Sequence, residues 1–294
     1  MSSIEKWLAK NTTSLKGKTV AITGSTGALG RELCTYLATL GASLVLVDRN
    51  AARGNAFCKE LSVRFPDVTV SSICADLANV ASVKEAAIQL STRSVDVFIH
   101  NAGAYAIPRH KCATGLDNVF QINFLSPYYL INTLLPHLRE RRGRVVIVSS
   151  IAHDYAKSDP CDVDFSTRSR ASLVYGNAKR HLTFALAELF RNETEASLAI
   201  THPGISFTGI TAHYPKLIFA LIKYPMKLIF MKPKKACLST LQGVFESTGP
   251  DAWIGPRILD IWGFPRKKPL RSAKKEERAQ IFARAESLYE IMKE

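Results

Sequence analysis

Two residues in the second half of the chain have the types and the spacing needed for proton transfer. Tyr175 and Lys179 are one helical turn apart in VYGNAKRHLTFALAEL, so their side chains would share one face of a helix. A phenol can exchange a proton near neutral pH when a nearby cation stabilises its anion, and Lys179 supplies that cation. Ser150 ends the apolar run RVVIVSS, and its hydroxyl can hydrogen-bond a substrate oxygen. The pattern predicts acid–base chemistry on an oxygen-bearing substrate.

A glycine-rich segment near the N-terminus has the features of a dinucleotide-binding turn. TGSTGALG follows an apolar run and precedes a run of helix formers, so a pyrophosphate could bind at the helix N-terminus. Asp48 ends the next apolar run, where a carboxylate can accept hydrogen bonds from the ribose hydroxyls of NAD. Arg49 could instead pair with the 2′-phosphate of NADP, which Asp48 would repel. NAD is therefore favoured, and NADP remains the alternative.

The elements that would position these residues alternate between strand-like and helix-length segments, which is typical of an α/β fold. Several strand-like runs are almost wholly Val, Ile and Leu, as in strands covered on both faces. The predicted strands are 19–23, 43–48, 68–74, 95–100, 144–150 and 197–203. The predicted helices are about 29–40, 51–64, 79–92, 116–139 and 172–192. We expect a Rossmann doubly wound parallel sheet, with ligands at its carboxyl edge.

No repeat or low-complexity linker divides the chain, so a single domain over 17–294 is expected after an N-terminal extension at 1–16. The apolar and basic segment 205–240 is interrupted by Pro215, Pro225 and Pro233. We expect this segment to form a short helical lid over a substrate cleft. A terminal helix is expected at about 272–293.

Charge and cysteine content limit the partners and the compartment. The net charge is +14, and residues 213–275 contain 13 Lys and Arg against three acidic residues. No nucleic-acid-binding motif accompanies these charges, so nucleic acid is not expected, whereas peripheral contact of 213–275 with an anionic membrane stays a hypothesis. Six cysteines without a Cys-x-x-Cys pair suggest neither a metal site nor a disulfide framework. We expect a cytoplasmic protein, peripheral membrane contact being the alternative.

Taken together, the motifs resemble the short-chain dehydrogenase/reductase family. They are TGSTGALG, HNAG at 100–103, Asn123, Ser150, the Tyr175–Lys179 pair and HPGISFT at 202–208, and they span about residues 17–260. The long insertion between Ser150 and Tyr175 and the segment 205–240 are similar to the retinol-dehydrogenase-like branch. Two positions depart from the family pattern. His100 replaces a usual Asn, and Ala28 occupies a usual glycine position, the middle glycine having moved to Gly27.

The resemblance implies roles for individual residues. Tyr175 would be the general acid/base, and Lys179 would lower its pKa and hold the nicotinamide ribose. Ser150 would orient the carbonyl group, and Asn123 would support a proton-relay water. The expected cofactor contacts are Thr23, Gly24, Ser25, Gly27, Ala28, Leu29, Gly30, Asp48, Arg49, Asp76, Leu77, Asn101, Ala102, Gly103, Tyr175, Lys179, Pro203, Gly204, Ile205 and Thr208.

The expected function is hydride transfer between NAD(P) and an alcohol/carbonyl pair, lipophilic in view of the apolar lid. The alternative is a non-catalytic sensor or scaffold that binds a dinucleotide and could lie at a membrane surface. The presence of all four catalytic groups argues against this alternative. A hydrolase using His153 and Asp154 is excluded because no Gly-x-Ser-x-Gly turn surrounds either serine. Helices 116–139 and 172–192 resemble those that pair subunits in this family, so a homo-oligomer is expected.

Overall fold

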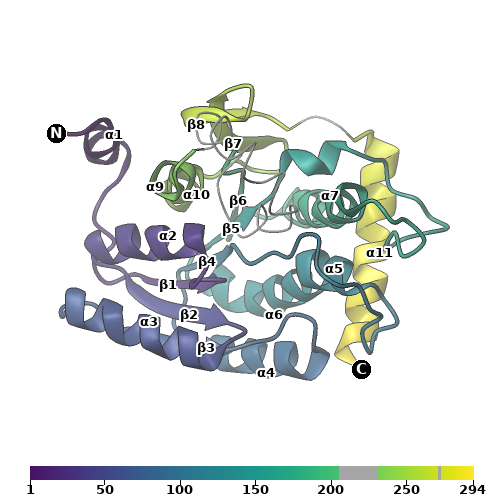
Figure 1. The fold of residues 1–294 in the computed structure, drawn as a ribbon, viewed down its shortest axis with the longest axis horizontal. Helices are drawn as coiled ribbons and strands as arrows, with labels where there is room; N and C mark the ends of the chain where they lie inside the picture. Colours follow the sequence, from purple (N-terminus) through teal and green to yellow (C-terminus); the bar gives the residue numbers. More distant parts are fainter. Residues whose placement is uncertain (205–230, 271–272) are drawn as a thin grey trace, which may run out of the picture.

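One eight-stranded sheet runs through the part of the chain that the structure describes, residues 1–204, 231–270 and 273–294 of the computed structural model (Figure 1). The strands are β1 (Thr19–Thr23), β2 (Ser43–Asp48), β3 (Val70–Cys74), β4 (Val97–His100), β5 (Arg144–Val148), β6 (Ser197–Thr201), β7 (Ala252–Ile258) and β8 (Trp262–Pro269). Their order is β3-β2-β1-β4-β5-β6-β7-β8, parallel except for the antiparallel pair β7–β8. The chain changes direction across the sheet between β1 and β4. This confirms the predicted doubly wound α/β fold.

Helices cover both faces of the sheet because alternate strand side chains point to opposite sides. Ile22 belongs to a core with α2 (Ala28–Thr39), α3 (Ala51–Arg64) and α10 (Leu238–Phe245), whereas Ala21 belongs to the other core. That second core includes α4 (Val80–Ser91), α6 (Ser126–Glu140) and α7 (Ala171–Leu189), with α11 (Lys275–Lys293) packed outside α7 (Figure 1). No described helix has the length and apolar character needed to cross a bilayer.

The helix predicted over 116–139 has three parts. A short α5 (Asn118–Phe120) leads into a π-helical turn, η1 (Gln121–Leu125), which continues into α6. The wider π turn displaces the regular backbone hydrogen bonds. Asn123 lies in this turn, and its Nδ2 donates to the carbonyl of Val119 at 2.8 Å. The buried amide therefore satisfies the backbone at the irregularity.

Three segments outside the central sheet can be compared with their predictions: the N-terminal extension, the lid and the terminal helix. The extension at 1–16 contains the helix α1 (Ser3–Asn11), and Trp7 stacks on Phe264 of β8 with ring centres 6.5 Å apart. Of the predicted lid, 205–230 lies outside the described residues; the rest contains α9 (Pro233–Ala236) and the start of α10, which packs into the sheet's covering layer. The helix expected at 272–293 is observed as α11.

Helix α11 packs beside the two helices that were expected to pair subunits. It lies along α7 and also contacts α6 (Figure 1). Glu277 of α11 accepts hydrogen bonds from Arg180 of α7 at 2.8 and 2.7 Å. The homo-oligomer stays a prediction.

Candidate active site

A cleft of about 820 Å³ lies at the carboxyl edge of the sheet. Its walls come from the segments that follow β1, β2, β3, β4, β5 and β6, and from α7. The predicted site residues that line it are Thr23, Gly24, Gly27, Ala28, Leu29, Gly30, Asp48, Arg49, Asp76, Leu77, Asn101, Ala102, Gly103, Ser150, Tyr175, Lys179, Pro203 and Gly204. Ser25 and Asn123 are buried behind its wall. Ile205 and Thr208 lie outside the described residues.

The glycine-rich turn can accommodate a pyrophosphate. Gly24 has a φ of +69°, and a Cβ there would lie 2.8 Å from the Cα of Ala102. A Cβ at Gly30 would lie only 2.3 Å from the carbonyl oxygen of Gly24, so the helix can approach the strand only with glycine. Helix α2 begins after Gly27 without a side-chain cap, which leaves N–H groups available to an anion. These features fit the dinucleotide predicted from the sequence.

The carboxylate of Asp48 is less available to a ribose hydroxyl than the sequence suggested. Its carboxylate is buried and accepts hydrogen bonds from the hydroxyl of Ser25, and from the amide and hydroxyl of Thr26 at 3.0 and 2.8 Å. Asp48 therefore holds the glycine-rich turn in place as well as lining the cleft. Two exposed guanidinium groups, of Arg49 and Arg53, line the same end.

Thr23 organises the turn after β4. Its hydroxyl accepts hydrogen bonds from the amides of Asn101 and Ala102, both at 3.1 Å, and lies 3.0 Å from Nδ1 of His100. The remaining hydroxyl proton is thus directed to His100, which must be neutral with its proton on Nε2. Burial and the charge of Lys179 both keep the pKa of His100 well below its ordinary value. The histidine that replaces the usual Asn still accepts a hydrogen bond from the neighbouring strand.

Asn123 connects this turn to the long helix. Its side chain exchanges two hydrogen bonds with Ala104, donating to the carbonyl at 2.8 Å and accepting from the amide at 3.1 Å. A Cβ at Gly103 would lie 3.0 Å from Oδ1 of Asn123 and 3.7 Å from Nζ of Lys179. Both donors of the Asn123 amide are occupied, since the second binds Val119. Its side chain therefore fixes the turn between the cofactor end and Lys179.

Ser150, Tyr175 and Lys179 come together at the other end of the cleft. Ser150 follows β5 and begins the 3₁₀ turn η2 (Ile151–Asp154), and its hydroxyl accepts from the amide of Ala152 at 3.2 Å. Tyr175 and Lys179 lie on α7, with the ammonium 5.7 Å from the centre of the Tyr175 ring. Lys179 also donates to the carbonyl of Val148 at 2.9 Å. A hydroxyl, a phenol and an ammonium thus face one cavity.

Burial decides the protonation of these groups. It lowers the pKa of Lys179 to about 8. Burial also raises the pKa of Tyr175 above its ordinary value, against the opposing effect of a hydrogen bond with Ser150. The upward shift comes from burial and from the neighbouring Tyr105 and Tyr155, so the phenol is protonated here. That Lys179 lowers the pKa of Tyr175 stays a prediction.

Several residues of the cleft were not predicted. Tyr105 lies edge-on to Tyr175 with ring centres 5.4 Å apart, and Tyr155 and Ser172 line the same wall. The sequence offered one indication that Tyr105 lines the cleft, namely its position two residues after the HNAG turn. Asp76 was expected to contact the cofactor; its carboxylate also accepts from the amide of Ala78 at 3.0 Å, so it stabilises its own turn.

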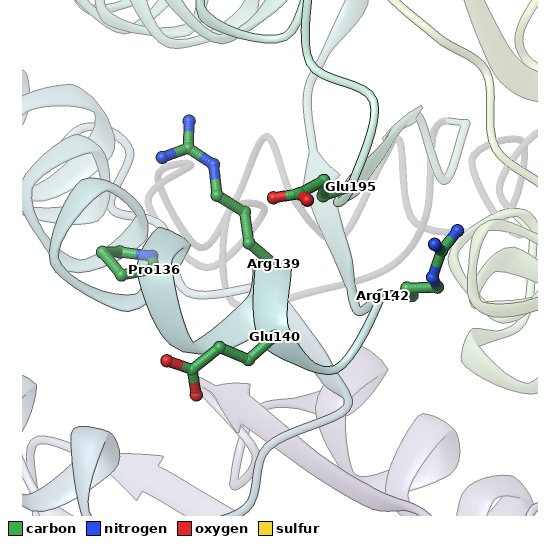
Figure 2. A pocket seen from close by; sticks show the side chains of 5 residues that line it. All are labelled: Pro136, Arg139, Glu140, Arg142 and Glu195. Atoms are coloured by element: carbon green, nitrogen blue, oxygen red, sulfur yellow. The ribbon is translucent and has the colours of Figure 1, made fainter.

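A second hollow lies at the opposite, amino edge of the sheet (Figure 2). It is lined by Pro136, Arg139, Glu140, Arg142 and Glu195. Arg139 is paired with Glu193 at 2.7 Å, and Figure 2 shows Glu140 directed away from Arg139. This hollow brings together no nucleophile or acid–base pair comparable with the first cleft. The described residues also contain no cluster of His, Cys, Asp and Glu able to hold a metal ion.

Known proteins resemble this chain in sequence and in fold. Residues 18–159 match the family model described as short chain dehydrogenase. Retinol dehydrogenase 12 of Mus musculus is 30% identical over 219 residues, which are 71% of this chain and 69% of that protein. Retinol dehydrogenase 13 of Homo sapiens is 27% identical over 206 residues, 68% of this chain but only 62% of that protein.

A solved structure extends the likeness to nearly the whole chain. The crystal structure of an uncharacterized protein from Mycobacterium paratuberculosis has a TM-score of 0.70 and 26% identity, and the match covers 97% of this chain and 96% of that one. The fold, the cleft and these relatives agree with one another. The chain belongs to the short-chain dehydrogenase/reductase family of NAD(P)-dependent oxidoreductases.

Proposed function

We propose that this protein transfers a hydride between NAD and a lipophilic alcohol or carbonyl compound, with Tyr175 as the general acid/base. The observation that carries the proposal is the convergence of Ser150, Tyr175 and Lys179 on the cleft whose other end is the glycine-rich turn. The residues beside Tyr175 are largely apolar or aromatic: Tyr105, Ile107, Ile151 and Tyr155. They suit a substrate with an apolar body and one oxygen. Two relatives named for retinol agree with this class.

The mechanism follows from the positions of these groups. When bound, the nicotinamide supplies a carbon that accepts hydride from the alcohol carbon or returns it to the carbonyl carbon. In reduction, the hydroxyl of Ser150 hydrogen-bonds the carbonyl oxygen, and Tyr175 gives its proton to that oxygen as negative charge develops. The ammonium of Lys179 stabilises the phenolate that remains. Oxidation reverses each step, with the phenolate removing the hydroxyl proton.

The direct test is Tyr175→Phe. We expect turnover to be lost while dinucleotide affinity, measured by quenching or enhancement of nicotinamide fluorescence, stays nearly unchanged. The matched control is Tyr155→Phe, which removes a phenol hydroxyl from the same wall but leaves Tyr175, and should retain most of the turnover. Substrates are found by screening primary and secondary alcohols and their carbonyl partners at the nicotinamide absorbance. Full activity in Tyr175→Phe would exclude the proposed role.

The preference for NAD rests on the charge of Asp48. Its carboxylate is fixed at the ribose end by Ser25 and Thr26, and Oδ2 retains a lone pair for a ribose hydroxyl. A 2′-phosphate at this place would meet a buried negative charge, which Arg49 and Arg53 would have to offset from exposed positions. Asp48→Asn keeps one acceptor oxygen for the turn but removes the charge.

We expect Asp48→Asn to shift the ratio of kcat/KM values toward NADP by about tenfold. The control is Thr26→Val, which loosens the turn without changing the charge and should weaken both dinucleotides alike. An unchanged ratio in Asp48→Asn would mean that Asp48 supports the turn but does not select the nucleotide.

A further inference from the structure

The turn between β7 and β8 exposes a group of large apolar side chains. Leu259 is 82% exposed, Ile258 51% and Trp262 44%. Val63 on α3, Ile88 on α4 and Ile291 on α11 are also exposed, but they lie on separate elements. A cluster of this kind on an ordinary soluble surface is unfavourable and marks a contact site. Figure 1 shows the hairpin at one end of the molecule, far from α3.

The backbone conformation of this turn does not favour the leucine at position 259. Leu259 and Asp260 have φ values of +50° and +57°, in the left-handed region where Gly, Asn and Asp are favoured. Leucine is a poor choice there, and its side chain gains no burial in return. Folding alone would be served better by Asn at this position. We therefore expect the side chain of Leu259 to contact another molecule.

Several basic residues lie on the elements that form or contact the exposed tip. Lys232, Lys234 and Lys235 belong to α9 or to the residue before it, and the ammonium of Lys235 lies 3.8 Å from the centre of the Trp262 ring. Arg257 and Arg266 are exposed on the two strands. The nearby carboxylates are already paired, Asp260 with Lys268 at 2.7 Å and Glu246 with Lys267 at 3.6 Å. The face is thus an apolar tip within a basic rim.

The same turn contacts two residues that line the cleft. The carbonyl oxygen of Asp260 lies 3.0 Å from Nε2 of His202, and the carbonyl oxygen of Ile261 packs against Gly204. His202 and Gly204 both line the cleft. A surface that contacts the tip would therefore lie close to the cleft.

We propose that this tip and its basic rim form a docking face for an anionic lipid bilayer. Leu259, Ile258 and Trp262 enter the headgroup region, where an aromatic side chain and short apolar side chains are stabilised, while the lysines and arginines attract lipid phosphates. Through this face the protein lies against the membrane surface. Docking brings the cleft to lipophilic alcohols dissolved in the bilayer; this last step rests on the proposed function.

Other occupants fit the face less well. A second copy of the chain would bring one basic rim against another, and a stable interface needs roughly 800 Å² from each partner, more than three side chains offer. RNA would match the positive rim but would give no role to the exposed Leu259. An anionic bilayer matches the apolar tip and the charge together.

The test uses the full chain and vesicles of phosphatidylcholine, with or without phosphatidylserine. Sedimentation should show binding to the anionic vesicles, weakened by salt, and little binding to the neutral ones. Leu259→Asn suits the backbone of the turn and should weaken binding by about tenfold. The matched control is Val63→Asn, which removes another exposed apolar side chain and should leave binding unchanged. Bromine-labelled lipids should quench the fluorescence of Trp262, and Trp262→Phe should remove that component.

The outcomes separate docking from catalysis. Equal sedimentation with both vesicle types, or unchanged binding in Leu259→Asn, would overturn the docking face. Concentration-dependent dimers without lipid that disappear in Leu259→Asn would assign the tip to a protein interface and also overturn it. Turnover of a water-soluble alcohol without vesicles should be equal in Leu259→Asn and the original chain. Failure of turnover with intact vesicle binding would contradict only the proposed function.

Discussion

The ammonium of Lys179 is 5.7 Å from the centre of the Tyr175 ring and donates a 2.9 Å hydrogen bond to the carbonyl of Val148, the last residue of β5. The same burial that brings these groups together removes the ammonium from water and lowers its pKa to about 8. Lys179 therefore changes charge close to physiological pH. In the proposed mechanism Tyr175 passes through its anionic form during proton transfer, and the neighbouring charge matters most at that point.

We predict that kcat/KM for carbonyl reduction falls as the pH rises through about 8. Lys179 is cationic below this pH and neutral above it, so the phenolate of Tyr175 loses its stabilising charge on the alkaline side. Lys179→Arg should keep some turnover and move the decline to higher pH, because guanidinium stays protonated. Initial rates across the pH range check this. A decline at the same pH in Lys179→Arg would assign it to another group.

A second prediction concerns the ion pair between α7 and α11. The guanidinium of Arg180 is 2% exposed and pairs with Glu277, which also accepts hydrogen bonds from the amide and hydroxyl of Ser158 at 2.9 and 3.0 Å. Glu277→Gln leaves a buried cation without its counter-charge, and should lower the free energy of unfolding by about 3 kcal/mol. Denaturant unfolding measures the change. The control on the same helix is Glu290→Gln, an exposed partner of Lys293, expected to cost less than about 1 kcal/mol.

The same ion pair predicts a pH dependence of stability. Burial raises the pKa of Glu277, but hydrogen bonds from Arg180 and Ser158 outweigh it and hold the pKa at about 2, against an ordinary value of 4.5. A carboxylate with a lowered pKa stabilises the fold above its ordinary pKa and loses this effect as the pH falls through the lowered value. The difference in melting temperature between the original chain and Glu277→Gln should therefore shrink as the pH falls from 4.5 towards 2. A constant difference would place the stabilising interaction elsewhere.

Much of this site could be predicted because it depends on local patterns. The strand that ends before Ser149 and the helical spacing of Tyr175 and Lys179 are visible in the sequence, and a parallel sheet gathers such ends at one edge. The glycine-rich turn was equally visible in the sequence. The contacts that Asp48 and Asn123 make could not be predicted from it. Both side chains bond to backbone or hydroxyl groups on other elements, Asp48 to the turn after β1 and Asn123 to Ala104.

The other features that the sequence did not predict depend on contacts between distant parts of the chain. Strand β8 has two prolines and several charges, which suggest a loop, and it forms because it pairs with β7 and packs against Trp7. Helix α11 was expected, but its place on α7 depends on an ion pair between residues 97 positions apart. The raised pKa of Tyr175 depends on burial, which has no local signature.

The moved glycine of TGSTGALG leads to a further prediction. A Cβ at Gly30 would lie 2.3 Å from the carbonyl oxygen of Gly24, whereas one at Gly27 would lie 3.4 Å from the same atom. Gly30→Ala should therefore displace the turn, lower the free energy of unfolding by roughly 1–3 kcal/mol and weaken dinucleotide binding. Gly27→Ala should change the free energy of unfolding little. Thermal unfolding and titration with NADH compare the two variants, and equal losses would contradict this account of the turn.

The last prediction concerns the hydrogen bond that Thr23 gives to His100. With the amides of Asn101 and Ala102 both directed at the Thr23 oxygen, the hydroxyl proton must go to Nδ1 of His100. Nitrogen-15 NMR should show Nδ1 unprotonated and Nε2 protonated, with no titration between about pH 5 and pH 8, because burial keeps this pKa well below its ordinary value. Thr23→Val leaves these groups without a partner and should cost about 2 kcal/mol of stability. His100→Asn retains an acceptor for Thr23 and should cost less, whereas a protonated Nδ1 in the original chain would reverse the assigned direction of this hydrogen bond.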